Sequence, residues 1–347
     1  MRIIYGVSGE GFGHSSRAKE ILPFLLKRKH RILVVTYGQA YEVLKNYSGI
    51  DVLKVEGIEL FFKEGKGLSL TKTVFNNLKK IEGNIKNFDE IMKRVRKFEP
   101  QLAISDMEPM VPIIRHLLKI PLICFDNQHR LTHLKLNVPK KYKTEYNLAK
   151  YFVRKTVSRA DYYVILSFAK GKPVKDMKKV YVADPILRDK ITKLKIEERN
   201  FILVYLTKKD EKILNILRKL DENFVVYGYD IDKQEGNIRF KKAGEGFLDD
   251  LRRCLGIIAS AGFTLMSEAI YLKKPYYAIP LKGQFEQTLN ALFLKQEKLG
   301  DFSEDPKIED IRRFLNKLKG YKVELRNYKI NPRDAVDALD KAIKLFG

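Results

Sequence analysis

Tryptophan is absent from this 347-residue sequence, and cysteine occurs only at Cys124 and Cys254, both inside apolar runs. Two such cysteines exclude a disulfide framework and a metal site built on cysteine ligands. No run of 18 apolar residues occurs, so no membrane-spanning helix is expected. Residues 2–6 look like a core strand and not like a charged leader before an apolar segment, which favours a cytoplasmic protein.

Acidic residues are also scarce relative to basic ones. The chain has 43 Asp and Glu against 67 Lys and Arg, a net charge of +24, and residues 130–179 alone carry 14 basic and 3 acidic residues. Such a surface attracts anions, including nucleic acids, acidic membranes and phosphorylated substrates. No RNP, KH, zinc-finger or helix-turn-helix signature is present, so nucleic acid is not an expected partner.

Short apolar runs alternate with amphipathic stretches along the whole chain. This alternation predicts an α/β protein with parallel sheets buried on both faces. The charged segment 191–200 interrupts the pattern and predicts two domains joined by a linker, with ligands at the carboxyl ends of the strands in a cleft. The expected strands are 3–8, 32–37, 51–56, 101–105, 121–125, 162–167, 179–183, 201–206, 223–229, 256–259 and 275–279.

A glycine-rich loop ending in His14 follows the first expected strand. Gly9, Gly11 and Gly13 allow a ligand to approach the backbone closely, and the helix that follows offers N–H groups to an anion. The G-x-G-x-G spacing and the lack of an acidic residue after the second strand argue against a dinucleotide site. The alternative for this loop is a tight turn with a packed histidine.

Polar residues also end two further strands at the same sheet edge. Asp106 and Glu108 follow strand 101–105, and Asn127 and Gln128 follow strand 121–125. A carboxylate such as Asp106, hydrogen-bonded to one nitrogen of His14, would fix the imidazole tautomer and raise the basicity of the other nitrogen. The alternative for Asp106 is an N-cap of the next helix. For the second pair, the choices are acceptor binding and a hydrogen-bonded turn.

The second half repeats the arrangement of a strand, a glycine and a helix start. The turn 262–264 can offer N–H and hydroxyl groups to phosphates, and Glu268, one helical turn further, can accept hydrogen bonds from a ribose diol. Glu286 and Gln287 open another helix and suit sugar hydroxyls. Asp230 and Asp232 form a D-x-D pair, which can bind a metal, but a solvated loop is the favoured interpretation.

The order of these motifs resembles that of GT-B nucleotide-sugar glycosyltransferases, specifically the MurG-like and UDP-glycosyltransferase groups. The resemblance spans both halves and implies two Rossmann-like domains that face each other across a cleft. It assigns acceptor binding to residues 1–190 and the nucleotide sugar to residues 199–331, with a helix at 332–347 crossing back onto the first domain. It further implies an inverting transfer of a hexose-type sugar, with UDP-sugar favoured, to an acceptor hydroxyl, without metal or cofactor.

The resemblance also implies a role for each candidate residue. His14 would be the general base and Asp106 its orienting partner. MurG-type enzymes carry a glycine-rich loop where this chain has residues 205–209, so Thr207 would contact phosphate there in another way. The remaining assignments are donor binding by Gly262, Phe263, Thr264, Glu268, Gln284, Glu286 and Gln287, and acceptor binding by Gly11, Gly13, Glu108, Asn127 and Gln128.

MurG-like proteins dock on membranes to reach lipid-linked acceptors. For this chain the resemblance therefore implies a polyprenyl-linked or other membrane acceptor, an anionic membrane surface as partner, and a peripheral location on the inner face of the cell membrane. The basic region 130–179 and the amphipathic stretch 73–97 are the candidate contact segments, and a solvated basic face is the alternative. For the whole chain the alternatives are a basic nucleic-acid-binding protein, a GT-B sugar-nucleotide epimerase and an inactive subunit.

Overall fold

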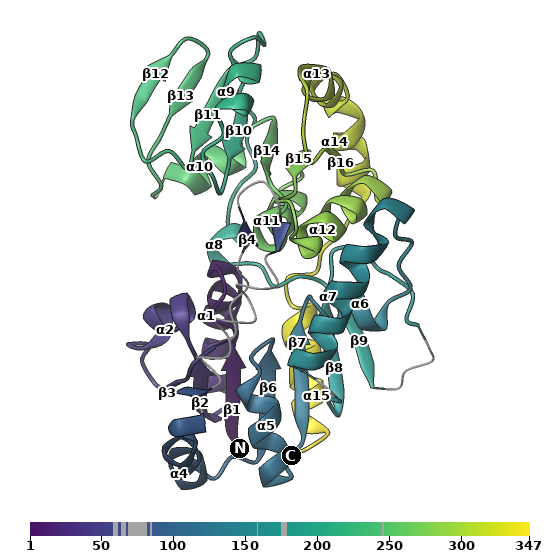
Figure 1. Ribbon diagram of the computed structural model, residues 1–347. Coiled ribbons are helices and arrows are strands. Elements are labelled where there is room, and N and C mark those ends of the chain that lie inside the picture. The colour runs from purple at the N-terminus through teal and green to yellow at the C-terminus, as the bar shows by residue number, and fades with distance from the viewer. Residues whose placement is uncertain are drawn as a thin grey trace. The chain divides into compact units, whose positions relative to one another are not determined.

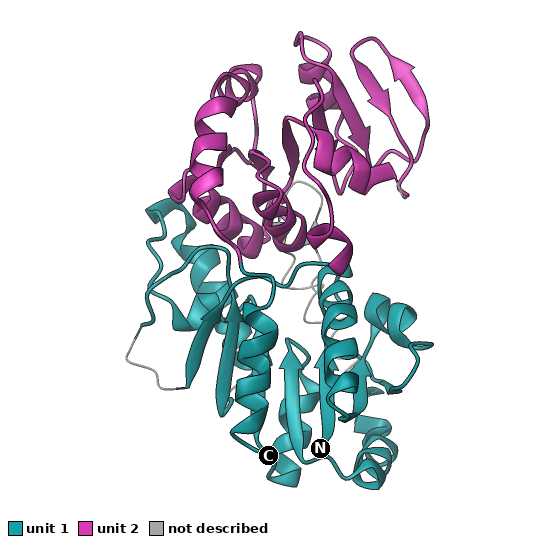
Figure 2. Cartoon of the chain, turned by 180° about the vertical axis from the view of Figure 1, so that it is seen from behind, with its two compact units in different colours: residues 1–188, 331–347 teal, residues 189–330 magenta. Residues whose placement is uncertain are grey.

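The chain folds into two compact units in the computed structural model (Figure 2). One unit comprises residues 1–188 and 331–347, and the other comprises residues 189–330. The structure describes residues 1–57, 62–63, 67–68, 82–83, 85–157, 159–174, 179–244 and 246–347. No helix within these ranges is long and apolar enough to cross a membrane.

The first unit contains a seven-stranded sheet in which all strands are parallel, in the order β3-β2-β1-β6-β7-β8-β9 (Figure 1). Its central strands are buried along their whole length because helices cover both faces. Its strands are β1 (Arg2–Val7), β2 (Arg31–Thr36), β3 (Asp51–Lys54), β6 (Leu102–Asp106), β7 (Leu122–Asp126), β8 (Tyr162–Leu166) and β9 (Val180–Ala183). A separate pair, β4 (Phe62–Lys63) and β5 (Gly67–Leu68), is antiparallel.

The last helix of the chain belongs to this first unit. Helix α15 (Asp334–Lys344) packs against β7, β8 and β9. The carboxylate of Asp334 accepts hydrogen bonds from the Tyr181 hydroxyl at 2.8 Å and from the Asp184 backbone N–H at 2.9 Å, which fixes the start of the helix. The other helices of the unit are α1 (Phe12–Lys27), α2 (Gly38–Leu44), α4 (Phe88–Phe98), α5 (Met110–Leu118), α6 (Arg130–His133), η1 (Lys140–Tyr142) and α7 (Lys143–Thr156).

The second unit contains another seven-stranded sheet, in the order β12-β13-β11-β10-β14-β15-β16. All neighbours are parallel except β12 and β13. Its strands are β10 (Ile202–Tyr205), β11 (Phe224–Tyr227), β12 (Lys233–Glu235), β13 (Ile238–Phe240), β14 (Gly256–Ser260), β15 (Tyr276–Ile279) and β16 (Gly300–Phe302). Its helices are α8 (Asp189–Thr192), α9 (Glu211–Leu217), α10 (Gly246–Arg253), α11 (Phe263–Tyr271), α12 (Phe285–Gln296), α13 (Ile308–Asn316) and α14 (Leu318–Asn327).

These two sheets confirm the predicted α/β class. Each expected strand is present, with ends shifted by at most two residues. The sequence pattern did not predict β12, β13 and β16, which have only three residues each and lack a long apolar run, or the two-residue strands β4 and β5. Of the amphipathic stretch 73–97, residues 73–81 and 84 lie outside the described residues, and α4 covers the last part.

The strand order reverses direction once in each sheet. In the first unit β1 lies between β2 and β6, and in the second unit β10 lies between β11 and β14. Loops leaving two such neighbouring strands run to opposite faces of the sheet, which leaves a crevice at the carboxyl edge. His14 lies in the first turn of the helix after β1, Asp106 ends β6, and Thr207 and Gly262 follow β10 and β14, so these predicted site residues lie at the reversals.

Candidate active site

Helix α1 begins at the glycine loop that follows β1. Its N-cap, Gly11, has a φ of 69°, a left-handed conformation that favours glycine, and has no side chain to bond the first N–H groups. No acidic residue lies in the first turn, so the helix start stays open to an anionic or polar ligand. Gly13 is exposed in this turn, whereas His14 is 9% exposed and turns towards the sheet edge.

His14 and Asp106 lie in direct contact. The imidazole Nδ1 is 2.8 Å from Oδ1 of Asp106, which ends β6 and is fully buried. A carboxylate only accepts hydrogen bonds, so Nδ1 is the donor and Nε2 is left with its lone pair. The side-chain amide of Gln128 lies 3.4 Å from Nε2. This geometry gives His14 the form that a general base requires.

Arg17 is the residue of this cluster that the sequence analysis missed. Its Nε donates to Oδ2 of Asp106 at 2.7 Å and one terminal nitrogen donates to Oδ1 at 2.8 Å. The other terminal nitrogen donates to Oδ1 of Asn127 at 3.1 Å. Burial lowers the pKa of the Arg17 guanidinium, but the Asp106 carboxylate outweighs it and the net pKa is raised. Position 17 lies one helical turn after His14, and this i,i+3 spacing is the signal that could have identified it.

Glu108 is placed differently from the acceptor-binding role that the resemblance gave it. Its side chain is fully buried, and its two carboxylate oxygens accept the backbone N–H groups of Met110 at 2.9 Å and Val111 at 2.8 Å. Both donors lie in the first turn of α5, so Glu108 caps the helix that Asp106 was expected to cap as its alternative role. This placement favours a structural role for Glu108.

The burial of Glu108 predicts a specific pH dependence of stability. Burial raises the pKa of this carboxyl to about 7, and the two backbone N–H groups lower it only in part. A carboxyl whose folded pKa is raised stabilises the fold fully below its unfolded pKa and loses that contribution as pH rises through the folded pKa. We therefore expect Glu108→Gln to flatten the pH dependence between about pH 4.5 and 7, by up to about 3 kcal/mol.

Urea unfolding of the wild type and the Glu108→Gln variant at several pH values measures this difference. Glu90→Gln, on the exposed face of α4, is the matched control and should leave the pH profile unchanged. Parallel stability curves for wild type and Glu108→Gln would show that Glu108 is ionised in the fold throughout this range.

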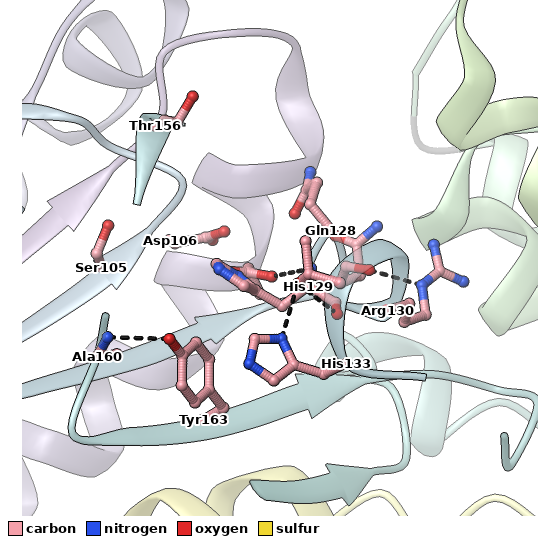
Figure 3. Close-up of polar contacts among 12 residues, drawn as sticks. Ser105, Asp106, Gln128, His129, Arg130, His133, Thr156, Ala160 and Tyr163 are labelled. Carbon is pink, nitrogen blue, oxygen red and sulfur yellow. Dashed lines mark hydrogen bonds and ion pairs between the residues drawn. The ribbon is translucent and has the colours of Figure 1, made fainter. Parts of the chain in front are cut away.

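A second histidine–carboxylate pair follows β7. Nδ1 of His129 lies 2.7 Å from Oδ2 of Asp126, and the His129 backbone N–H donates to Oδ1 at 2.8 Å. The His129 ring packs 5.1 Å from the Tyr163 ring, and Figure 3 shows His133 beside Tyr163 as well. Burial and the neighbouring His129 lower the pKa of His133 to about 4. The rings of His129, His133 and Tyr163 thus pack against one another next to the loop that carries Asn127 and Gln128.

One group of side chains in the described ranges has the atoms to hold a metal ion. Cys124, Asp126 and His129 place their ligand atoms within 4.8 Å of one another, and all three are buried. Burial raises the pKa of the Cys124 thiol well above its usual value, which disfavours the thiolate that binds metals. Because His129 already bonds both oxygens of Asp126, the group is satisfied by its own contacts.

The D-x-D pair, Asp230 and Asp232, for which a solvated loop was the favoured interpretation, lies in the loop between β11 and β12. Asp230 has a φ of 55°, and Oδ1 of Asp232 accepts the backbone N–H of Lys242 at 3.2 Å. Neither residue belongs to a group of metal-ligating side chains among the residues that the structure describes.

In the second unit, the predicted anion site lies at the start of α11. Its N-cap is Gly262, no side chain caps the helix, and no acidic residue lies in its first turn. Thr264 is half-buried there, Phe263 is 8% exposed, and Asn290 donates to the carbonyl of Ala261 at 2.9 Å, which holds the preceding turn. Glu268 lies further along α11 and is 1% exposed.

The remaining predicted donor-binding residues lie after β10 and at the start of α12 in the second unit. Thr207 follows β10, and its hydroxyl donates to Oγ of Ser260 at 3.1 Å, which brings it to the end of β14. At the start of α12, the Gln287 amide donates to Oε1 of Gln284 at 2.7 Å and its oxygen accepts the Leu281 N–H at 3.0 Å. These bonds close the turn, while Glu286 is half-buried in the first turn of the helix.

Comparison with known proteins shows which family this chain matches. Residues 1–319 match the model described as glycosyl transferase family 1. A protein of Methanosarcina mazei, described as an uncharacterized glycosyltransferase, is 23% identical over 92% of this chain and 91% of its own length. The structure of CalG4, the calicheamicin glycosyltransferase, superposes with a TM-score of 0.70 at 14% identity, covering 100% of this chain and 98% of its own. MurG of Acinetobacter baumannii gives 0.63 at 14% identity, covering 99% of both chains.

Proposed function

The chain belongs to glycosyl transferase family 1 and is a glycosyltransferase of the GT-B type, and we propose that it uses a nucleoside diphosphate sugar as its donor. In the proposed reaction a hexose is transferred to an acceptor hydroxyl with inversion of the anomeric configuration. The observation that carries the proposal is the contact between His14 and Asp106 at the carboxyl edge of the first sheet. The same resemblance that linked the sequence to MurG-like and UDP-glycosyltransferases favours a UDP-sugar as the donor.

In the proposed reaction the first unit supplies the base. Nε2 of His14 takes the proton of the acceptor hydroxyl while its oxygen attacks the anomeric carbon of the sugar. The bond between that carbon and the diphosphate oxygen breaks on the opposite face, so the configuration inverts and the nucleoside diphosphate leaves. Gln128 lies beside the base and Asn127 is bonded to Arg17, and both would orient the acceptor.

The second unit binds the donor. The start of α11, at 262–264, would hold the diphosphate, because the backbone N–H groups of the first helical turn and the helix dipole stabilise the charge that develops on the leaving group. This supports a reaction that needs no metal ion. Glu268 would bind the ribose, Thr207 a phosphate, and Gln284, Glu286 and Gln287 the sugar.

A nucleotide panel tests the donor site. We expect one of UDP, GDP, CDP, dTDP and ADP, with UDP favoured, to raise the unfolding temperature in a salt-resistant manner, since a ligand at 100 times its Kd adds about 2.7 kcal/mol. Glu268→Gln should weaken the affinity for that nucleotide about tenfold or more, because a charged acceptor is lost. Glu309→Gln, at an exposed position of α13, is the control.

Equal shifts from all five nucleotides that disappear in high salt would instead mean that the basic surface collects anions without a specific site. An unchanged affinity in Glu268→Gln would remove this residue from the donor contacts. Adding EDTA to the transfer assay tests metal independence, and lost activity that Mg²⁺ or Mn²⁺ restores would contradict it.

We further propose that the acceptor is lipid-linked and that α7 contacts an anionic membrane surface. Tyr142, at the N-cap of α7, and Val153 within the helix are buried, but Tyr151 is 62% exposed and Leu148 is 38% exposed. Nζ of Lys155 lies 5.6 Å from the centroid of the Tyr151 ring. Exposed aromatic and basic side chains together suit the interface of a bilayer.

Vesicle sedimentation tests this contact. We expect binding to phosphatidylglycerol vesicles at low salt, little binding to phosphatidylcholine vesicles, and a loss of about 1 kcal/mol or more in binding free energy for Lys155→Glu. Lys93→Glu, at an exposed position of α4, makes the same charge change elsewhere. Equal losses in both variants would indicate general charge attraction without a specific contact by α7.

A further inference from the structure

The carboxylate of Asp106 has two partners that compete for it. In a simple histidine–carboxylate pair the carboxylate charge is available to stabilise the protonated imidazole. Here the Arg17 guanidinium donates to both oxygens of Asp106, at 2.7 Å and 2.8 Å, while His14 shares only Oδ1. Both Asp106 and Arg17 are buried, so water screens this charge compensation little.

Arg17 also lies close to the imidazole itself. Its terminal nitrogen is 3.1 Å from Nδ1 of His14, and both atoms are donors when Nδ1 carries a proton. The guanidinium hydrogen is therefore directed to Oδ1 of Asp106, the acceptor that the two groups share. A fixed cation at this distance opposes the protonated form of the imidazole.

The other groups around this cluster do not replace the Arg17 charge. Tyr5 on β1 is fully buried, its hydroxyl has no hydrogen-bond partner among the described residues, and burial raises its pKa, so it stays neutral. Asp126 on β7 acts on Arg17 electrostatically but is held by His129. The groups after β7, Asn127 and Gln128, are neutral amides.

We propose that Arg17 is a positioning residue that keeps His14 neutral, with its proton on Nδ1, by compensating and aligning the Asp106 carboxylate. Through its bond to Asn127 it also ties this pair to the loop after β7, so that the base and the acceptor-side loop share one fixed frame. The inference rests on the proposed role of His14 as the base.

Nitrogen NMR of the full chain tests the proposal without any substrate. The sequence has five histidines, so ¹⁵N-histidine labelling gives five imidazole patterns, and His14→Gln identifies the one that belongs to His14. The wild type should show the Nδ1–H tautomer. In Arg17→Met the Asp106 charge is uncompensated, and the His14 imidazole should protonate about one pH unit higher or more.

Two further variants separate charge from geometry. Arg17→Lys keeps the cation but cannot reach both oxygens of Asp106 and Asn127 at once, so we expect a smaller shift and a changed Asn127 amide signal. Arg28→Met, at the C-cap of α1, removes an arginine that is half exposed and paired with Asp340, and should leave the His14 pattern unchanged.

A wild-type His14 with its proton on Nε2 would overturn the proposal, as would a folded Arg17→Met variant that titrates like the wild type. If Arg17→Met does not fold, the tautomer of His14 in the wild type and the titration of Arg17→Lys still test the role proposed for Arg17. Because no sugar or nucleotide is used, failure of the proposed transfer reaction would leave these readouts unaffected, and the two outcomes are distinguishable.

Discussion

Replacing His14 with alanine is expected to lower the kcat of sugar transfer by about 10²- to 10⁴-fold, the range that a positioned general base contributes. The side chain is 9% exposed, its Nδ1 is bonded to Asp106, and the Gln128 amide lies 3.4 Å from its Nε2. The measurement is release of the nucleoside diphosphate from the nucleotide sugar whose nucleotide stabilises the protein in the thermal panel.

The same variant should bind the nucleotide as tightly as the wild type, since the proposed donor contacts belong to the second unit. His116→Ala, at an exposed position of α5, is the matched control and should retain full turnover. Near-normal turnover in His14→Ala would remove the base assignment, and a parallel loss of nucleotide affinity would point to a disturbed fold instead.

The second large effect is on stability: Asp106→Ala is expected to destabilise the first unit by about 3–5 kcal/mol. The substitution removes the carboxylate that compensates Arg17, and that guanidinium is only 7% exposed. A buried cation without its partner is costly, whereas in a compensated pair the mutual attraction offsets much of the desolvation cost. Chemical denaturation of the single variant measures the loss.

The double variant Asp106→Leu with Arg17→Met removes both charges and should recover most of that loss. Asp337→Ala, which breaks an exposed pair with Arg333 in α15, should change stability by about 1 kcal/mol or less. A loss below about 1 kcal/mol in Asp106→Ala would mean that water reaches Arg17 and that the pair is not buried in solution.

Several features could be predicted from the sequence because they depend on local patterns. Apolar runs of strand length alternating with amphipathic stretches predicted the parallel core of both sheets, since a strand buried on both faces must be apolar along its length. The motif order from the loop at His14 to the turn at Gly262 gave the GT-B fold, which the family match and the superposed structures confirm. The strands β12, β13 and β16 were missed because three residues carry too little periodicity.

Only the tertiary structure decided which hydrogen-bond partner each polar residue at the edge of the first sheet has. Asp106 and Glu108 stand two residues apart, and the sequence allows either to cap the next helix. In the structure Glu108 accepts the N–H groups at the start of α5. Asp106, at the end of β6, instead contacts His14 of α1. Arg17, 89 residues away in sequence, then bonds both of its oxygens. Such pairing across strands depends on the order of β1, β6 and β7 in the sheet, which local sequence patterns do not encode.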